Sequence, residues 1–188
     1  MKFDDKNFEF LAGWGLETLA LMRHADAGDP VQWRGSDQDR PLTEKGLAQA
    51  HLSSLGLLTL CVPTFVMTSD YVRAVQTADV TCRVLADDRG KHLPSRLVSP
   101  TLRPEADPQE WMNYMSGFKG MGAMVDMPHR TLLVVGHEPF LSVLAEMIFR
   151  QPSGFMPKAG LLLIHLDEVG RVKSQRLFAP GELAQLGS

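Results

Sequence analysis

The sequence predicts an α/β domain of three layers, in which helices cover both faces of a mostly parallel central sheet. Short apolar runs alternate along the chain with longer amphipathic runs, as expected for strands joined by helical crossovers. The short runs are apolar without interruption, which is typical of strands that are covered on both faces. Charged or polar side chains follow several of these runs directly, at the strand ends where ligands bind in α/β sheets.

The expected strands are short apolar runs that stop at charges or turn residues. They span residues 18–22, 64–67, 131–135 and 160–166, with a polar edge strand at 172–178 and a further candidate at 96–98. The expected helices are longer runs in which apolar residues recur at helical spacing. They span residues 43–58, 72–86, 108–118 and 139–149.

The length of 188 residues is typical of one domain. We expect residues 1–17 to form an N-terminal extension and residues 18–188 to form the domain. The N-terminus lacks a basic stretch followed by a continuous apolar one, and the longest apolar runs are far shorter than the ~20 residues of a membrane span. We therefore expect a cytoplasmic protein that does not bind membranes.

Charge and cysteine content exclude several classes of function. The 19 Lys and Arg residues against 22 Asp and Glu residues give a net charge of −3, whereas binding to nucleic acid phosphates usually requires a positive excess. Cys61 and Cys82 lie far apart, without the spacing of a zinc site or a disulfide framework. We expect two buried thiols, no metal and no nucleic acid partner.

Basic and imidazole side chains stand at three of the predicted strand ends. Arg23 and His24 follow the first strand, and Arg73 lies in the first turn of the helix after the second. His137 follows the strand at 131–135. Each side chain alone is compatible with a structural role. Together, two guanidinium groups could hold phosphate oxygens while a neutral imidazole attacks phosphorus, provided that the strands are neighbours.

Four stretches of the chain resemble motifs of the histidine phosphatase superfamily, also called phosphoglycerate mutase-like. The sequence LMRHA at residues 21–25 resembles the RHG signature, with Ala25 in place of the usual glycine. Residues 69–78 resemble the S-x-x-x-R-A-x-Q-T-A element, and residues 134–139 resemble the VGHxP element. Residues 37–46 are similar to the D-x-x-RPLTxxG stretch of SixA-like phosphohistidine phosphatases. The resemblance covers most of the chain and implies the phosphoglycerate mutase-like fold.

The resemblance implies a role for each residue that matches a motif. His24 would be the nucleophile and become phosphohistidine. Arg23, Arg73 and His137 would hold the phosphoryl oxygens, and Ser69 is a candidate accessory phosphate ligand. This mechanism needs neither a metal nor another cofactor.

The general acid is the open point of this assignment. Many members of the superfamily carry a glutamate for this purpose, whereas SixA-like members generally lack it in the usual context. In this chain Glu105 is the better candidate and Asp107 the other. Alternatively, both are solvent-exposed loop acids, and Asp107 caps the helix that follows. A phosphoramidate needs less proton donation than an alkyl phosphate ester does.

We therefore expect a metal-independent phosphatase that hydrolyses phosphohistidine on proteins through a covalent intermediate on His24. A small-molecule phosphomonoesterase of the same fold is the alternative, and Glu105 acting as an acid would favour it. A non-catalytic phosphoprotein-binding module is the alternative of a different class, although binding alone does not require a nucleophilic imidazole. The expected partner is a phosphorylated protein or a small phosphorylated substrate.

Overall fold

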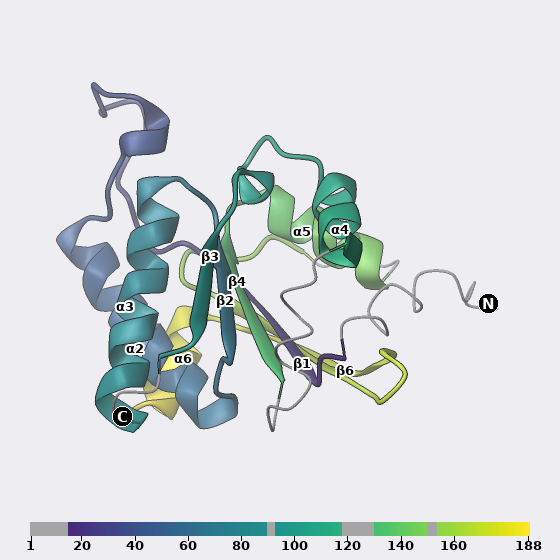
Figure 1. Ribbon diagram of the computed structural model, residues 1–188. Coiled ribbons are helices and arrows are strands. Elements are labelled where there is room, and N and C mark those ends of the chain that lie inside the picture. The colour runs from purple at the N-terminus through teal and green to yellow at the C-terminus, as the bar shows by residue number, and fades with distance from the viewer. Residues whose placement is uncertain (1–14, 90–92, 118–129, 150–153) are drawn as a thin grey trace.

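The computed structural model describes residues 15–89, 93–117, 130–149 and 154–188. One sheet of six strands, in the order β3-β2-β4-β1-β5-β6, has helices on both faces (Figure 1). The strands are β1 (Thr18–Arg23), β2 (Phe65–Thr68), β3 (Ser95–Val98), β4 (Thr131–Gly136), β5 (Leu161–Leu166) and β6 (Val172–Phe178). The predicted α/β class and layered arrangement are confirmed.

The sheet is mostly parallel, as predicted. β1 runs parallel to β4, β4 to β2, and β2 to β3. β5 runs antiparallel to both of its neighbours, β1 and β6. This direction follows from where β5 begins, because Leu161 pairs with Met22 at the end of β1. The polar strand β6 lies at the edge of the sheet, where the sequence places it.

The helices form two groups, one on each face of the sheet. The helices α2 (Glu44–Leu60), α3 (Val72–Arg89) and α6 (Pro180–Leu186) cover one face, and α4 (Pro108–Gly117) and α5 (Phe140–Phe149) cover the other (Figure 1). The short helix α6 is missing from the sequence prediction, because seven residues are too few to show a helical period. Within the described ranges, no helix is long and apolar enough to cross a membrane.

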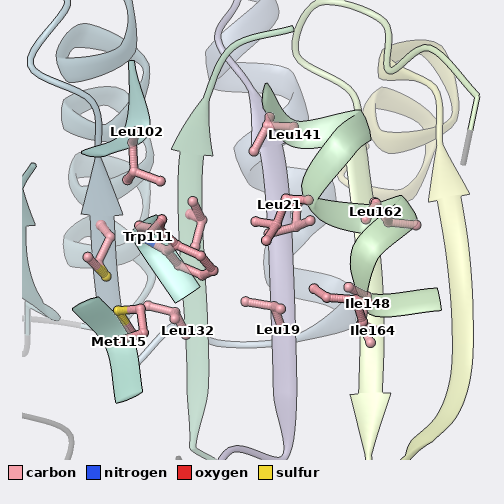
Figure 2. Close-up of a cluster of buried hydrophobic side chains, with 14 of the residues drawn as sticks. Leu19, Leu21, Leu102, Trp111, Met115, Leu132, Leu141, Ile148, Leu162 and Ile164 are labelled. Carbon is pink, nitrogen blue, oxygen red and sulfur yellow. The ribbon is translucent and has the colours of Figure 1, made fainter. Parts of the chain in front are cut away.

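Side chains of the central strands alternate between two hydrophobic clusters. Leu21 and Leu132 point toward α4 and α5, where they pack with Trp111 in the cluster shown in Figure 2. Met22 and Leu133 point the other way, into the cluster that α2, α3 and α6 cover. This burial on both faces explains why the strands are apolar without interruption.

The chain enters the sheet through residues 15–17, the described part of the predicted N-terminal extension. Leu16 is buried in the same cluster as Leu21. The carbonyl oxygen of Glu17 accepts a hydrogen bond from the amide of Leu166 at 2.9 Å. Residues 1–14 lie outside the described residues.

The helices α2 and α6 come closest at Gly56. A Cβ atom at this position would lie 2.1 Å from the carbonyl oxygen of Leu183, so the backbone of α6 would have to move to admit it.

We expect Gly56→Ala to lower the free energy of unfolding by about 1–3 kcal/mol, as overpacking does elsewhere. Urea unfolding followed by far-ultraviolet circular dichroism measures this change. Gly181→Ala on α6 is the control, since nothing lies within 4 Å of its Cβ position. An unchanged unfolding free energy for Gly56→Ala would contradict the close packing.

Candidate active site

The ends of β1 and β4 bring the two predicted site histidines together. Arg23 is the register partner of Gly136, and the His24 amide donates to the Gly136 carbonyl oxygen at 2.9 Å. His24 and His137 therefore leave neighbouring strands side by side, and their ring centroids lie 5.0 Å apart. Their exposed fractions are 6% and 1%. Two residues far apart in the sequence thus share one buried site at the carboxyl end of the parallel strands.

Hydrogen bonds fix the orientation of the His24 ring. Its Nδ1 lies 2.7 Å from the carbonyl oxygen of Ala25, so Nδ1 carries the hydrogen and donates it. The other nitrogen, Nε2, then holds a lone pair and accepts from Nε of Arg73 at 3.3 Å. Burial, together with repulsion from Arg73 and Arg23, lowers the pKa of His24 to about 3, although the Ala25 hydrogen bond opposes this shift. The ring is therefore neutral at physiological pH.

Arg73, in the first turn of α3, is held in place by Asp37. Its Nη1 donates to the Asp37 carbonyl oxygen at 2.6 Å, and its Nη2 donates to Oδ2 of Asp37 at 2.9 Å. The other carboxylate oxygen of Asp37 accepts from Nε of Arg40 at 2.8 Å. Asp37 belongs to the 3-10 turn η2 (Asp37–Asp39) in the loop after β1. The sequence pattern predicts no role for Asp37, although this residue stands first in the stretch 37–46 that resembles the SixA-like motif.

Arg23 has a donor group that is free to meet an anion. Its Nη1 donates to the Met156 carbonyl oxygen at 2.9 Å. Its Nε is buried and has no hydrogen-bond partner in the part of the chain that the structure describes. Burial lowers the pKa of Arg23, and the nearby Glu138 carboxylate opposes that shift. Glu138 also accepts a hydrogen bond from the Met156 amide at 2.9 Å. This bond holds the segment before β5 next to the site.

His137 is a second buried imidazole, and its hydrogen-bonding groups are not used within the described protein. Neither of its ring nitrogens has a hydrogen-bond partner among the described residues. Burial, followed by repulsion from His24 and Arg73, lowers the pKa of His137 to about 2. Buried polar atoms in proteins normally have a partner. A neutral His137 can donate its one N–H group to a ligand oxygen.

The two other predicted site residues, Ser69 and Glu105, lie beside this cluster. Ser69 is buried just after β2, and its hydroxyl oxygen accepts from the Tyr71 amide at 3.3 Å. Glu105 is exposed, and its carboxylate oxygens accept from the Tyr71 hydroxyl at 3.2 and 3.4 Å. The Tyr71 ring packs edge-on against His137, with centroids 5.0 Å apart. Glu105 therefore connects to the histidines only through Tyr71 in the described structure.

Ala25 and Asp107 have structural roles in this chain. Among described residues other than glycine, only Ala159 has a positive φ, at 56°, so Ala25 replaces the family's glycine without backbone strain. The Ala25 amide donates to the Thr77 hydroxyl at 3.1 Å. Asp107 accepts from the Gln109 amide at 2.9 Å and caps α4, which is the alternative that the sequence offers for it.

The positive charge of the site comes from guanidinium groups. Arg23, Arg40 and Arg73 all act on the pKa of His24. In the described ranges, no group of three or more His, Cys, Asp or Glu side chains could hold a metal ion. Cys61 is a free, half-buried thiol whose pKa burial raises to about 12, so it supplies no thiolate at neutral pH. The arrangement can bind an anion next to a neutral imidazole.

The two buried histidines make stability depend on pH. The histidine pKa is 6.5 in its reference state, against about 3 for His24 and about 2 for His137 in the folded protein. As the pH falls below 6.5, the unfolded chain binds protons that the folded protein does not bind. The free energy of unfolding should therefore fall with pH, by up to about 1.4 kcal/mol per pH unit for each histidine.

Chemical denaturation between about pH 7.5 and pH 5 measures this slope. His137→Gln should make the slope shallower because it removes one of the two groups. His51→Gln, at an exposed position on α2, is the control. A wild-type unfolding free energy that is constant over this range would contradict the neutral, buried state of both rings.

The comparisons with known proteins agree with this geometry. A family model described as the histidine phosphatase superfamily (branch 1) matches residues 19–91, from β1 to α3. Among solved structures, the chain is similar to the protein histidine phosphatase SixA complexed with tungstate, at 25% identity and a TM-score of 0.71. The match covers 88% of this chain and 99% of that one. The resemblance to the histidine phosphatase superfamily is confirmed.

Other solved structures share the histidine phosphatase fold at lower identity. The putative phosphohistidine phosphatase SixA from Agrobacterium tumefaciens is 22% identical, with a TM-score of 0.62 over 88% of this chain and 99% of that one. The phosphoglycerate mutase from Bacillus anthracis str. Sterne is 17% identical, with a TM-score of 0.65 over 94% and 98%. No curated protein matches the sequence. The predicted phosphoglycerate mutase-like architecture is confirmed.

Proposed function

We propose that the protein is a phosphatase that hydrolyses phosphohistidine on proteins through a covalent phosphohistidine on His24. The observation that carries this proposal is the state of the His24 ring. Nδ1 donates to Ala25, which leaves the Nε2 lone pair next to Arg73 in a cationic site. An imidazole that only binds phosphate works better as a hydrogen-bond donor. Once a phosphoryl oxygen of the substrate takes over the Arg73 Nε donor, this neutral nitrogen has a free lone pair and is suited to attack phosphorus.

The reaction proceeds in two displacements at phosphorus. In the first, the Nε2 lone pair of His24 forms an N–P bond while the bond from phosphorus to the leaving nitrogen breaks. The electron pair of the broken bond departs with that nitrogen. In the second, a water oxygen bonds to phosphorus, the His24 N–P bond breaks and its electron pair returns to Nε2. One proton of the water ends on a phosphate oxygen, and the products are inorganic phosphate and free His24.

The residues around His24 supply charge and position. Arg23 and Arg73 hold the phosphoryl oxygens, and the neutral His137 donates to one of them. Negative charge is spread over these oxygens in the transition state, so fixed donors stabilise it. Asp37 keeps the Arg73 guanidinium in place with two hydrogen bonds, of 2.6 and 2.9 Å. Ser69, which is buried just after β2, is an accessory ligand.

The position of Glu105 supports a phosphoramidate as the substrate class. The carboxylate is exposed and bound to the Tyr71 hydroxyl, outside the buried cluster. A protonated imidazole can leave phosphorus as a neutral ring without a further proton donor, whereas an alkoxide cannot leave so easily. The neighbour described as a protein histidine phosphatase supports the same class.

A small-molecule phosphomonoesterase is the second candidate function, and the Tyr71–Glu105 hydrogen bond is the observation that favours it. In that case Glu105 protonates an alkoxide leaving group, either directly or through the Tyr71 hydroxyl. Glu105→Gln would then abolish hydrolysis of alkyl phosphates. Under our proposal the same variant still hydrolyses phosphohistidine, because the leaving imidazole needs no proton from Glu105.

The test compares the wild-type protein on a histidine-phosphorylated protein, on phosphoserine and on an aryl phosphate. We expect kcat/KM to be highest for phosphohistidine and unchanged when a metal chelator is added. A preference for the alkyl phosphate would favour the phosphomonoesterase. Phosphate binding without turnover of any substrate would favour a binding module and overturn the proposal.

A further inference from the structure

An aromatic ring stacks against the guanidinium group of each of the two site arginines. The Arg23 guanidinium carbon lies 4.6 Å from the ring centroid of Phe155, and that of Arg73 lies 4.7 Å from the ring centroid of Tyr71. The Phe155 side chain is 68% exposed. The mechanism proposed above uses neither ring. A large exposed phenylalanine beside a buried cationic site therefore needs an explanation of its own.

The Phe155 ring is fixed by its backbone, since both of its neighbours in the chain are anchored. The Gly154 carbonyl oxygen accepts from the Ser142 hydroxyl at 2.9 Å. On the other side, the Met156 amide donates to Glu138 at 2.9 Å, and its carbonyl oxygen accepts from Arg23 at 2.9 Å. The Met156 side chain is itself buried in the core. The segment thus presents Phe155 to solvent directly above Arg23.

The direction of phosphoryl transfer places these rings near the leaving group. The attacking nitrogen and the leaving atom lie on opposite sides of phosphorus. Since His24 is only 6% exposed, a substrate approaches it from the solvent side, and the leaving group lies on that side of phosphorus. Phe155 is exposed and Tyr71 is half-buried, and each ring stacks on one of the two arginines that would hold the phosphoryl oxygens. The exposed carboxylate of Glu105, bound to the Tyr71 hydroxyl, adds negative charge there.

We propose that Phe155 and Tyr71, with the Glu105 carboxylate, form a leaving-group subsite that selects a planar cationic ring. This inference rests on the proposed function and names the feature by which a phosphohistidine side chain is recognised. Aromatic faces attract cations and stack on flat rings, and a carboxylate favours a positive charge. The preferred ligand is a phosphorylated imidazole with a proton on its second nitrogen.

This preference selects the reactive form of the substrate. When the P–N bond breaks, its electron pair passes to the departing nitrogen, while the proton stays on the other ring nitrogen. The ring leaves as neutral imidazole, so the step needs no additional acid. A phosphorylated lysine has a P–N bond as well but offers no ring to stack on Phe155.

The experiment uses two peptides of identical sequence, one with phosphohistidine and one with phospholysine at the same position. The measured quantity is the ratio of their kcat/KM values. We expect Phe155→Leu to lower this ratio by about three- to tenfold, the size of an exposed cation–π contact or somewhat more. Phe155→Tyr, which keeps a ring, should retain the wild-type ratio. Val169→Ala, at a 53% exposed position in the turn between β5 and β6, is the control.

The outcomes separate this subsite from the proposed function. An unchanged ratio in Phe155→Leu, or an equal loss on both peptides, would overturn the subsite and leave the phosphatase assignment intact. A wild-type protein that hydrolyses neither peptide would overturn the proposed function and this inference together. Thermal unfolding of each variant checks that the exposed substitutions leave the fold unchanged.

Discussion

Replacing His24 with alanine should lower the turnover of phosphohistidine by at least about 10⁴-fold, because it removes the atom that bonds to phosphorus. The Nε2 of His24 is the ring nitrogen that Arg73 contacts directly, at 3.3 Å. The methyl group of alanine also leaves the guanidinium groups in place, so phosphate binding should persist. Steady-state kinetics with a histidine-phosphorylated protein measures the loss, and binding of inorganic phosphate measures what remains.

The matched control for this prediction is His51→Ala. His51 is an exposed histidine on α2, outside the site, and its replacement should leave turnover unchanged. Hydrolysis by His24→Ala at a rate near that of the wild type would exclude His24 as the nucleophile.

Arg73→Lys should lower kcat by about 10²-fold or more, which is the typical effect of losing one fixed donor to a developing negative charge. Arg73 donates to His24 through Nε and to Asp37 through both terminal nitrogens. A lysine ammonium group is a single point on a flexible stem and cannot make these contacts together. The charge is kept, so the loss reports the geometry of the guanidinium group. Turnover at saturating substrate measures the effect on kcat.

Arg83→Lys supplies the control, since Arg83 is an exposed residue of the same helix. It should behave like the wild type in both activity and thermal unfolding. If Arg73→Lys keeps the wild-type kcat while it remains folded, then the fixed orientation of Arg73 does not contribute to the chemistry.

Much of the fold could be predicted from the sequence because the signals are local. The uninterrupted apolar runs at β1 and β4 indicate strands covered on both faces, and the charges that follow them mark the strand ends. Their pairing as neighbours then places His24 beside His137. The direction of β5 has no such local signal. It depends on where the chain re-enters the sheet, at the end of β1.

Contacts between distant loops are what the sequence pattern could not predict. The clamp that Asp37 forms on Arg73 joins the loop after β1 to the start of α3. The stacking of Phe155 on Arg23 likewise joins the segment before β5 to the end of β1. Neither pair has a fixed sequence spacing or a period. Only the folded structure brings these residues together.

The most direct test of the account is to trap the phosphorylated enzyme. The wild-type protein is mixed with a histidine-phosphorylated protein, quenched in alkali within the first turnover, and digested for mass spectrometry. We expect phosphate on His24, stable in base and lost in acid, with no phosphorylated enzyme from His24→Ala. Phosphate found on another residue of the enzyme, or single-turnover release of phosphate without any phosphorylated enzyme, would contradict it.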